Sequence, residues 1–247
     1  MYEKIKSLAK QYYPETVAIR RDLHKYPEQG WLEMRTASLV AKKLEKLGYQ
    51  VLIGKEIMCE EYRMGVPDQE ILESNYQRAI SQGADPYYIK KVKDGFTAVA
   101  GILKNGSGPV VAIRFDMDAL CIEEDDSINH NPGKFGFISC NQGTMHACGH
   151  DGHVAIGLTV AKILSNIKDS IQGTIKLIFQ PAEEGVRGAK SICKSGILKD
   201  VDYIFAGHIW QQEANEDYDI YLGMNETFAT TKLDVIYHGV SSHAAGM

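Results

Sequence analysis

The stretch from His153 to Gln180, HVAIGLTVAKILSNIKDSIQGTIKLIFQ, joins a helix pattern to a strand pattern. Its first part, HVAIGLTVAKILSNI, is apolar on nearly every side, which indicates a buried helix. Its last part, GTIKLIFQ, is almost continuously apolar after Lys176, as in a strand that is covered on both faces. A buried helix that leads into a covered strand is typical of an α/β fold.

The regions on either side repeat this alternation. The spacing of apolar residues predicts helices within residues 1–50, ended by Gly48, and over 68–82 and 188–195. Strand patterns occur in YQVLIG, FTAVAGIL, PVVAIRFDM and VDYIFAGHIW, and we expect the last to be buried. Asn105-Gly106, between the second and third of these runs, predicts a β-hairpin. The whole pattern predicts an α/β sandwich.

Composition excludes several functional classes. The chain has 247 residues, 44% of them hydrophobic, and a net charge of -5. It has no basic excess for nucleic acid or a membrane surface, and no apolar run as long as a membrane span. The N-terminus lacks the apolar stretch of a secretory signal, and the five cysteines are odd in number and irregularly spaced. We therefore expect a protein of the reducing cytoplasm.

Polar residues gather where the predicted strands end or the next helix begins. In α/β sheets these are the places where binding sites assemble. The residues are Asp116 and Asp118, Cys148 and His150, Glu183 and Glu184, and His208.

Their chemistry predicts a metal site that supports hydrolysis. Thiolate, imidazole and carboxylate are good ligands for zinc and other transition ions. Of the adjacent Glu183 and Glu184, one can bind metal while the other stays free to accept a proton from water. Asp151 is expected to orient a ligand imidazole, and Asp116 and Asp118 to support the cation cluster from behind.

Other interpretations of single residues stay open. Cys148 is also a candidate nucleophile activated by His150 or His146, but that reading leaves the glutamates and His208 unexplained. His153 opens a helix and either caps it or lies near the site. Cys140 and Cys193 are expected to be ordinary thiols.

Several motifs, in order, resemble one family. They are RRDLHKYPEQGWLEMRTASLVAKKLEKLGY, VAIRFDMDAL, GTMHACGHDGH, IKLIFQPAEEGVRGAK and GHIW. The family comprises metal-dependent amidohydrolases that act on hippurate, N-acyl amino acids and auxin conjugates. The resemblance implies a three-layer α/β sandwich with a central mixed sheet, like that of zinc exopeptidases, and then a small ferredoxin-like lid used for dimer contacts.

The resemblance also implies roles for individual residues. Cys148, His150, Glu184 and His208 would hold two divalent ions, zinc or manganese, with Cys148 as the bridge. Glu183 would be the general base. YHGVSSHAAGM resembles the lid stretch whose histidine, here His243, supports the oxyanion in a partner subunit's site. The expected domains are residues 1–226, catalytic, with an insert at 55–94, and residues 227–247, the start of the lid.

The insert is similar to that of the p-aminobenzoyl-glutamate hydrolases within this family. These enzymes cleave a folate breakdown product to p-aminobenzoate and glutamate. Arg63 and Arg187 are candidate partners for the substrate carboxylates, and Asn225 and Thr230 are candidate lid contacts. The alternatives are a broader hydrolase of N-acyl amino acids or dipeptides, and a non-catalytic metal-binding subunit of a heteromeric hydrolase.

Family members continue well past the position that matches Met247 and carry a last metal-binding histidine there. The resemblance therefore implies that the 247-residue chain is weakly active or inactive alone. It also implies a homodimer, or a heteromer with a related subunit.

Overall fold

The computed structural model describes residues 1–127, 129–209, 233 and 235. The chain divides into two compact units, Met1–Gln211 and Gln212–Met247. Because only Leu233 and Val235 of the second unit are described, the fold reported below is that of the first. The expected domain boundary at 226/227 lies outside the described residues and stays a prediction.

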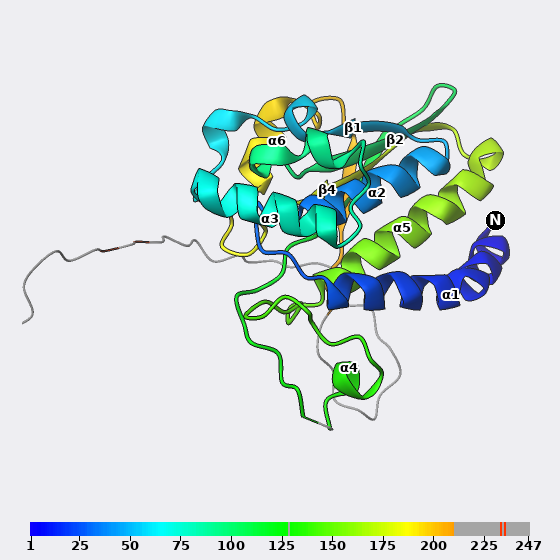
Figure 1. The fold of residues 1–247 in the computed structure, drawn as a ribbon. Helices are drawn as coiled ribbons and strands as arrows, with labels where there is room; N and C mark the ends of the chain where they lie inside the picture. The colour runs from blue at the N-terminus through cyan, green and yellow to red at the C-terminus, as the bar shows by residue number, and fades with distance from the viewer. Residues whose placement is uncertain (128, 210–232, 234, 236–247) are drawn as a thin grey trace, which may run out of the picture. The chain divides into compact units, whose positions relative to one another are not determined.

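A five-stranded mixed sheet forms the centre of the first unit (Figure 1), in the order β1-β2-β4-β3-β5. Strand β3 pairs in parallel with β4 and β5, whereas β2 pairs antiparallel with β1 and β4. The predicted α/β class is confirmed. The strands are β1 Gln50–Ile53, β2 Val99–Asn105, β3 Val110–Asp116, β4 Gly173–Gln180 and β5 Tyr203–Ala206.

Helices cover both faces of the sheet. Helices α2 and α5 contact the strands on one face, and α1 packs along α5 (Figure 1). Helix α6 lies over the other face, where Ile192 joins a core with Ile178 of β4. The helices are α1 Tyr2–Lys25, α2 Met34–Lys46, α3 Gln69–Ser81, α4 Asn131–Lys134, α5 His150–Asn166 and α6 Ala189–Ser195.

The predicted hairpin between β2 and β3 is wrong. Strand β4 lies between the two and pairs with both. The side-chain amide of Asn105 donates to the carbonyls of Lys168 and Ile171, at 2.9 and 2.7 Å, and so binds the turn to the segment that leads into β4. The apolar run of β4 favours a central position with cover on both faces, and this preference overrides the local turn signal.

The side chains of β4 divide the core in two. Leu177 and Phe179 point into the cluster under α2 and α5, while Ile178 points into the cluster with Trp31 and α6. This alternation follows from the two-residue period of a strand. It explains why the apolar run predicted for β4 has no solvent face.

Strand β5 is not buried as expected. The side chains of Tyr203, Ile204 and Phe205 are 60%, 56% and 59% exposed. Among the described strands, β5 lies at the edge of the sheet and pairs with β3 alone. An exposed apolar edge of this kind favours association with further chain or with a partner.

The insert forms helix α3 and several short 3-10 turns, and it packs beside the turn after β4. The predicted helix over 68–82 is confirmed as α3. The indole N–H of Trp31 donates to the carbonyl of Met64, and Arg187 Nη1 donates to that of Gly65. These two bonds attach the insert to the elements around the predicted site.

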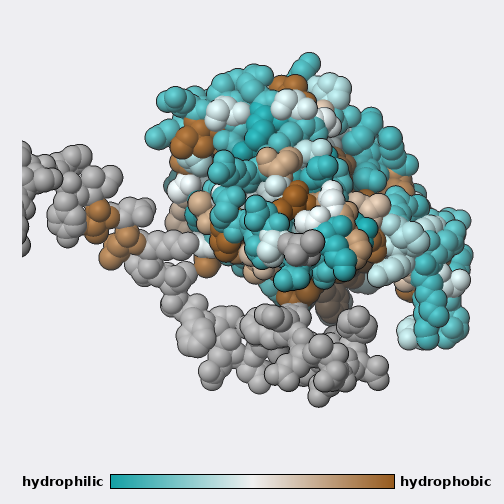
Figure 2. All heavy atoms as spheres, turned by 60° about the horizontal axis from the view of Figure 1, so that its bottom comes forward, coloured by the Kyte–Doolittle hydropathy of each residue, from teal (hydrophilic) through white to brown (hydrophobic). Residues whose placement is uncertain are grey.

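Hydrophilic residues dominate the face drawn in Figure 2, and apolar side chains form smaller patches between them. Among the described residues, no helix combines the length and the apolar character needed to cross a membrane.

Candidate metal centre

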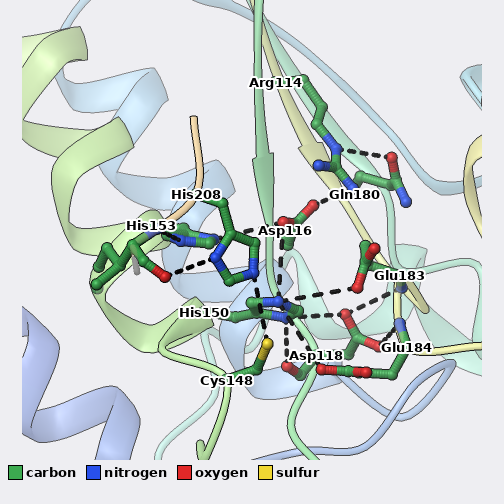
Figure 3. Close-up of polar contacts among 12 residues, drawn as sticks. Arg114, Asp116, Asp118, Cys148, His150, His153, Gln180, Glu183, Glu184 and His208 are labelled. Carbon is green, nitrogen blue, oxygen red and sulfur yellow. Dashed lines mark hydrogen bonds and ion pairs between the residues drawn. The ribbon is translucent and has the colours of Figure 1, made fainter. Parts of the chain in front are cut away.

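The predicted site residues meet at one edge of the sheet (Figure 3). Parallel strands β3, β4 and β5 end side by side here, so the residues that follow them converge. The imidazole of His150, at the start of α5, lies at the centre of the group. Around it are Asp116 at the end of β3 and Asp118 after it, Glu183 and Glu184 after β4, His208 after β5, Cys148 just before α5 and His153 in its first turn.

Two overlapping sets of ligand atoms lie within reach of an ion. The first comprises Cys148, His150 and Glu184, and the second comprises Asp116, His150, His153 and His208. Within each set the ligand atoms all lie within 4.8 Å of one another. The structure therefore brings together all four predicted metal ligands.

Several buried polar atoms in these sets have no hydrogen-bond partner. His150 Nε2 is one, and the nearest carboxylate oxygens, of Asp116, Glu183 and Glu184, are 3.8 to 3.9 Å away. Both oxygens of Asp116 and Oε1 of Glu184 are also without such a partner, although Arg114 forms an ion pair with Asp116. Because buried polar groups are nearly always paired, this concentration fits a site that can hold a cation. Two ligand atoms of a tetrahedral zinc ion lie about 3.3 to 3.8 Å apart. The separations of 3.4 Å between Cys148 Sγ and His208 Nε2, and of 3.8 to 3.9 Å from His150 Nε2 to the carboxylates of Asp116 and Glu184, are close to this.

Asp118 fixes the orientation of three groups in the site. Its main-chain carbonyl accepts a hydrogen bond from His150 Nδ1 at 2.8 Å, which leaves Nε2 facing the cluster. Its carboxylate accepts the backbone N–H groups of Glu183 and Glu184, at 3.0 and 2.9 Å. The residue predicted to support the cluster from behind therefore touches both glutamates.

His153 and His208 form a linked pair. The backbone N–H of Ile209 donates to His153 Nε2 at 2.9 Å, so a neutral His153 carries its proton on Nδ1, which faces Asp116 Oδ2 at 3.4 Å. His208 Nδ1 donates to the Ile209 carbonyl at 2.6 Å, and its Nε2 lies 3.4 Å from Cys148 Sγ. Of the two roles left open for His153, the geometry places it at the site.

The electrostatics of the site favour a cation over a thiol nucleophile. Burial and the neighbouring Glu184 raise the pKa of the Cys148 thiol to about 12. A cysteine nucleophile needs the opposite shift, so this environment disfavours that reading. Burial opposes a charge on His150, but the carboxylates of Asp118 and Asp116 outweigh it and raise its pKa. Burial and the charge of Asp116 raise the pKa of Glu183, which suits a proton acceptor.

Asp151 does not orient a ligand imidazole as expected. Its carboxylate contacts His24 Nδ1 and Arg20 Nε, each at 2.8 Å, and accepts the backbone N–H of Gly152. His24 Nε2 in turn contacts Glu124 Oε1 at 2.8 Å. Consecutive residues of α5 point about 100° apart, which turns Asp151 toward α1 and away from the cluster.

The two candidate arginines have different surroundings. Arg187 Nε donates to the main-chain carbonyl of Glu184 at 3.2 Å, so its guanidinium lies beside the turn after β4. Arg63 is buried over the ring of Phe96 and donates to the carbonyl of Asp94, and none of its described contacts involves the cluster. His243, Asn225 and Thr230 lie outside the described residues.

Four residues that the sequence did not single out contact the site or the residues that hold it. They are His24, Glu33, Arg114 and Glu124. Charged residues inside otherwise apolar motifs, such as Glu33 in WLEMRTA, were the available signal. His146 is buried without a described partner, and burial lowers its pKa to about 4.

Comparisons with known proteins agree with this geometry. Residues 112–242 match the family model described as peptidase family M20/M25/M40. An indole-3-acetyl-aspartic acid hydrolase of Enterobacter agglomerans is 46% identical over 96% of this chain and 54% of that protein. One of the subunits of the p-aminobenzoyl-glutamate hydrolase of Escherichia coli is 44% identical over 98% of this chain and 55% of that protein. The chain thus spans about half the length of these relatives.

Solved structures are similar over the same part. An aminobenzoyl-glutamate utilization protein from Klebsiella pneumoniae is 40% identical, with a TM-score of 0.71 over 84% of this chain and 46% of that chain. The YXEP protein of Bacillus subtilis, a dinuclear metal-binding peptidase of the M20 family, is 30% identical, with a TM-score of 0.59 over 81% of this chain and 44% of that chain.

Proposed function

Because the chain belongs to peptidase family M20/M25/M40, we propose that it supplies most of the catalytic domain of a metal-dependent amidohydrolase. The proposed reaction is hydrolysis of p-aminobenzoyl-glutamate to p-aminobenzoate and glutamate. The observation that carries the proposal is the set of unpaired, buried ligand atoms around His150 Nε2. We further propose that the domain comprises residues 1–226 and that the lid begins at 227.

The proposed cofactor is a pair of divalent ions, zinc or manganese. Cys148, His150, Glu184 and His208 would hold them. Sulfur, imidazole and carboxylate together suit these metals. When bound, the ions polarise the scissile carbonyl and lower the pKa of the attacking water.

Glu183 is the proposed general base. Its carboxylate is 33% exposed and faces His150 at 3.9 Å without replacing any of the four ligands. Its raised pKa brings the proton affinity of the Glu183 carboxylate closer to that needed for a general base at neutral pH. It would take the proton from the water and deliver it to the leaving amine. His243 is proposed to support the oxyanion in a partner subunit's site.

Two relatives suggest the class of substrate. The names of the hydrolases from E. agglomerans and E. coli describe amides of aspartate and glutamate, both of which leave a dicarboxylic amino acid. Arg187 is the better-placed candidate for such a carboxylate, because its guanidinium lies beside Glu184. Arg63 stays a weaker candidate, since its guanidinium already stacks on the ring of Phe96 and donates to the carbonyl of Asp94.

A broader amidohydrolase is the second candidate, since the indole-3-acetyl-aspartic acid hydrolase carries a different acyl group. Rates with p-aminobenzoyl-glutamate, hippurate and acetylated amino acids, at measured metal occupancy, separate the two. Comparable rates on all three substrates would favour the broader function. A preference for p-aminobenzoyl-glutamate would support the narrower one.

A non-catalytic subunit is the third candidate, because the E. coli relative is named as one subunit of its hydrolase. Glu183→Gln tests it in the assembled protein. We expect turnover to fall by about 10²–10⁴-fold, with metal content unchanged. An assembled enzyme that is indifferent to this change would make the chain a scaffold. We propose a homodimer or a heteromer with a related chain, in the cytoplasm, where the five free cysteines suit reducing conditions.

A further inference from the structure

Two buried carboxyl groups hold the turn that carries the glutamate pair. The backbone N–H of Ala182 donates to Glu33 Oε1 at 2.7 Å. The next two N–H groups, of Glu183 and Glu184, donate to the two oxygens of Asp118. Three successive amides are therefore each bound to a carboxyl oxygen, an arrangement that backbone turns of this kind favour.

Ala182 has an unfavourable backbone conformation. Its φ is +48°, in the left-handed region that residues with a Cβ rarely adopt. Its carbonyl accepts the N–H groups of Arg187 and Gly188, at 3.2 and 2.8 Å, so both sides of the residue are bonded. Such a conformation persists only when its surroundings determine it. The Glu33 contact on the N–H is one of those determinants.

Glu33 is well held for this task. Its side chain has no exposed surface, and Oε2 accepts the hydroxyl of buried Thr97 at 2.7 Å. Burial and the nearby charge of Asp118 raise the pKa of Glu33 to about 8. Glu33 acts on the turn through its reach and its two hydrogen bonds.

We propose that Glu33 is a positioning residue that holds Ala182 in the left-handed conformation and thereby sets the carboxylate of Glu183 against the attacking water. This inference rests on the proposed function of Glu183 as general base. Glu33 lies on the segment before α2 and is separated from Ala182 by 149 positions. The N-terminal segment would thus contribute to catalysis without touching substrate.

Three variants at this position test the proposal. Glu33→Gln keeps the length of the side chain and both hydrogen bonds, because the Thr97 hydroxyl can also accept. Glu33→Asp is shorter by one methylene and cannot reach both partners, and Glu33→Ala removes the group. The measurements are amide hydrogen exchange at Ala182 in the protein without substrate, and kcat and KM of the hydrolysis.

We expect Glu33→Asp and Glu33→Ala to speed exchange at Ala182 by about tenfold or more. We expect kcat to fall about 100-fold, with KM within about threefold, because misplacement of a reacting group by about 1 Å costs that much in rate. Glu33→Gln should stay within about threefold of the parent protein in both measurements. If Glu33→Ala does not fold, the Asp and Gln variants still give the comparison.

Glu28 offers a matched control. It is an equally buried carboxyl group, but it accepts the backbone N–H groups of Arg35 and Thr36 at the start of α2. Glu28→Ala should lower the melting temperature and leave both Ala182 exchange and the kcat of folded protein unchanged. A Glu28→Ala variant with an equal loss of kcat would reduce the effect of Glu33 to general destabilisation and overturn the proposal.

Different results would refute the positioning role of Glu33 and the proposed hydrolase function. The positioning role is refuted, even in an active enzyme, if Glu33→Asp leaves the exchange rate at Ala182 unchanged. It is also refuted if Glu33→Asp and Glu33→Gln give the same exchange rate and the same kcat. An assembled enzyme that contains this chain, has full metal occupancy and shows no amide hydrolysis refutes the proposed function, and the catalytic role of Glu33 with it.

Discussion

Two groups of buried histidines lie close together and differ in how their nitrogens are used. Both ring nitrogens of His24 contact carboxylates, of Asp151 and Glu124, at 2.8 Å each. His150 uses one nitrogen on the carbonyl of Asp118, and its other nitrogen has no partner. The adjacent residues His150 and Asp151 therefore belong to two different networks.

The difference separates stability from function. An unpaired buried polar group costs free energy, and folded proteins pair nearly all of them. The His24 network follows this rule, and the His150 cluster departs from it at several atoms at once. We infer that the first network stabilises the fold and that the second is completed by a ligand.

The largest expected effect comes from His150→Ala, which removes a ligand shared by both candidate sets. Replacing a partner of a ligand lowers metal affinity by about 10–100-fold, so removal of the ligand itself should exceed that, and turnover should be lost. Elemental analysis and calorimetric titration with zinc or manganese measure it. A His150→Ala protein with full metal content would show that the unpaired Nε2 of His150 is not a metal ligand.

The effect of His24→Ala should fall on stability. The change removes the histidine that lies between Asp151 and Glu124. Because Arg20 still pairs with Asp151 and His130 still contacts Glu124, we expect a loss of up to about 3 kcal/mol, the lower end for a broken buried pair. Urea unfolding measures the loss, and the same protein should bind metal with an affinity within about tenfold of the parent. If metal affinity falls and the unfolding free energy does not, His24 serves the metal site and not the stability of the fold.

A smaller effect concerns pH. Burial opposes the charge on His24, but Asp151 and Glu124 outweigh it and raise its pKa in the folded state. A raised pKa adds stability that is fully present below the unfolded value of about 6.5 and is lost as pH rises through the folded value. Asp151 and Glu124 have lowered pKa values and titrate at more acidic pH.

The difference in unfolding free energy between the parent and His24→Gln should therefore be larger near pH 6 than near pH 9, by on the order of 1 kcal/mol. Urea unfolding of both proteins across this range gives the value. A difference that grows with pH would show that His24 is neutral in the folded protein.

The α/β class, the order of helices and strands, and the gathering of Cys148, His150, Glu184 and His208 could be predicted from the sequence. The prediction worked because parallel strands end at the same edge, so strand-end residues meet wherever the sheet forms. It failed where the partner was distant. His24 and Asp151 are 127 positions apart, and no spacing rule connects them. The Asn105-Gly106 signal failed because β4 entered between the two strands that it was expected to join.

By itself, the sequence determined which residue types stand at the strand ends and which segments form helices and strands, because periodicity and chain breaks act through local backbone geometry. Only the tertiary structure decided which nitrogens and carboxyl oxygens are paired and which are left facing one another. Pairing of buried charges depends on contacts between segments far apart in the chain. For that reason the partners of His24 and of Glu33, and the orphaned Nε2 of His150, emerge only in the folded molecule.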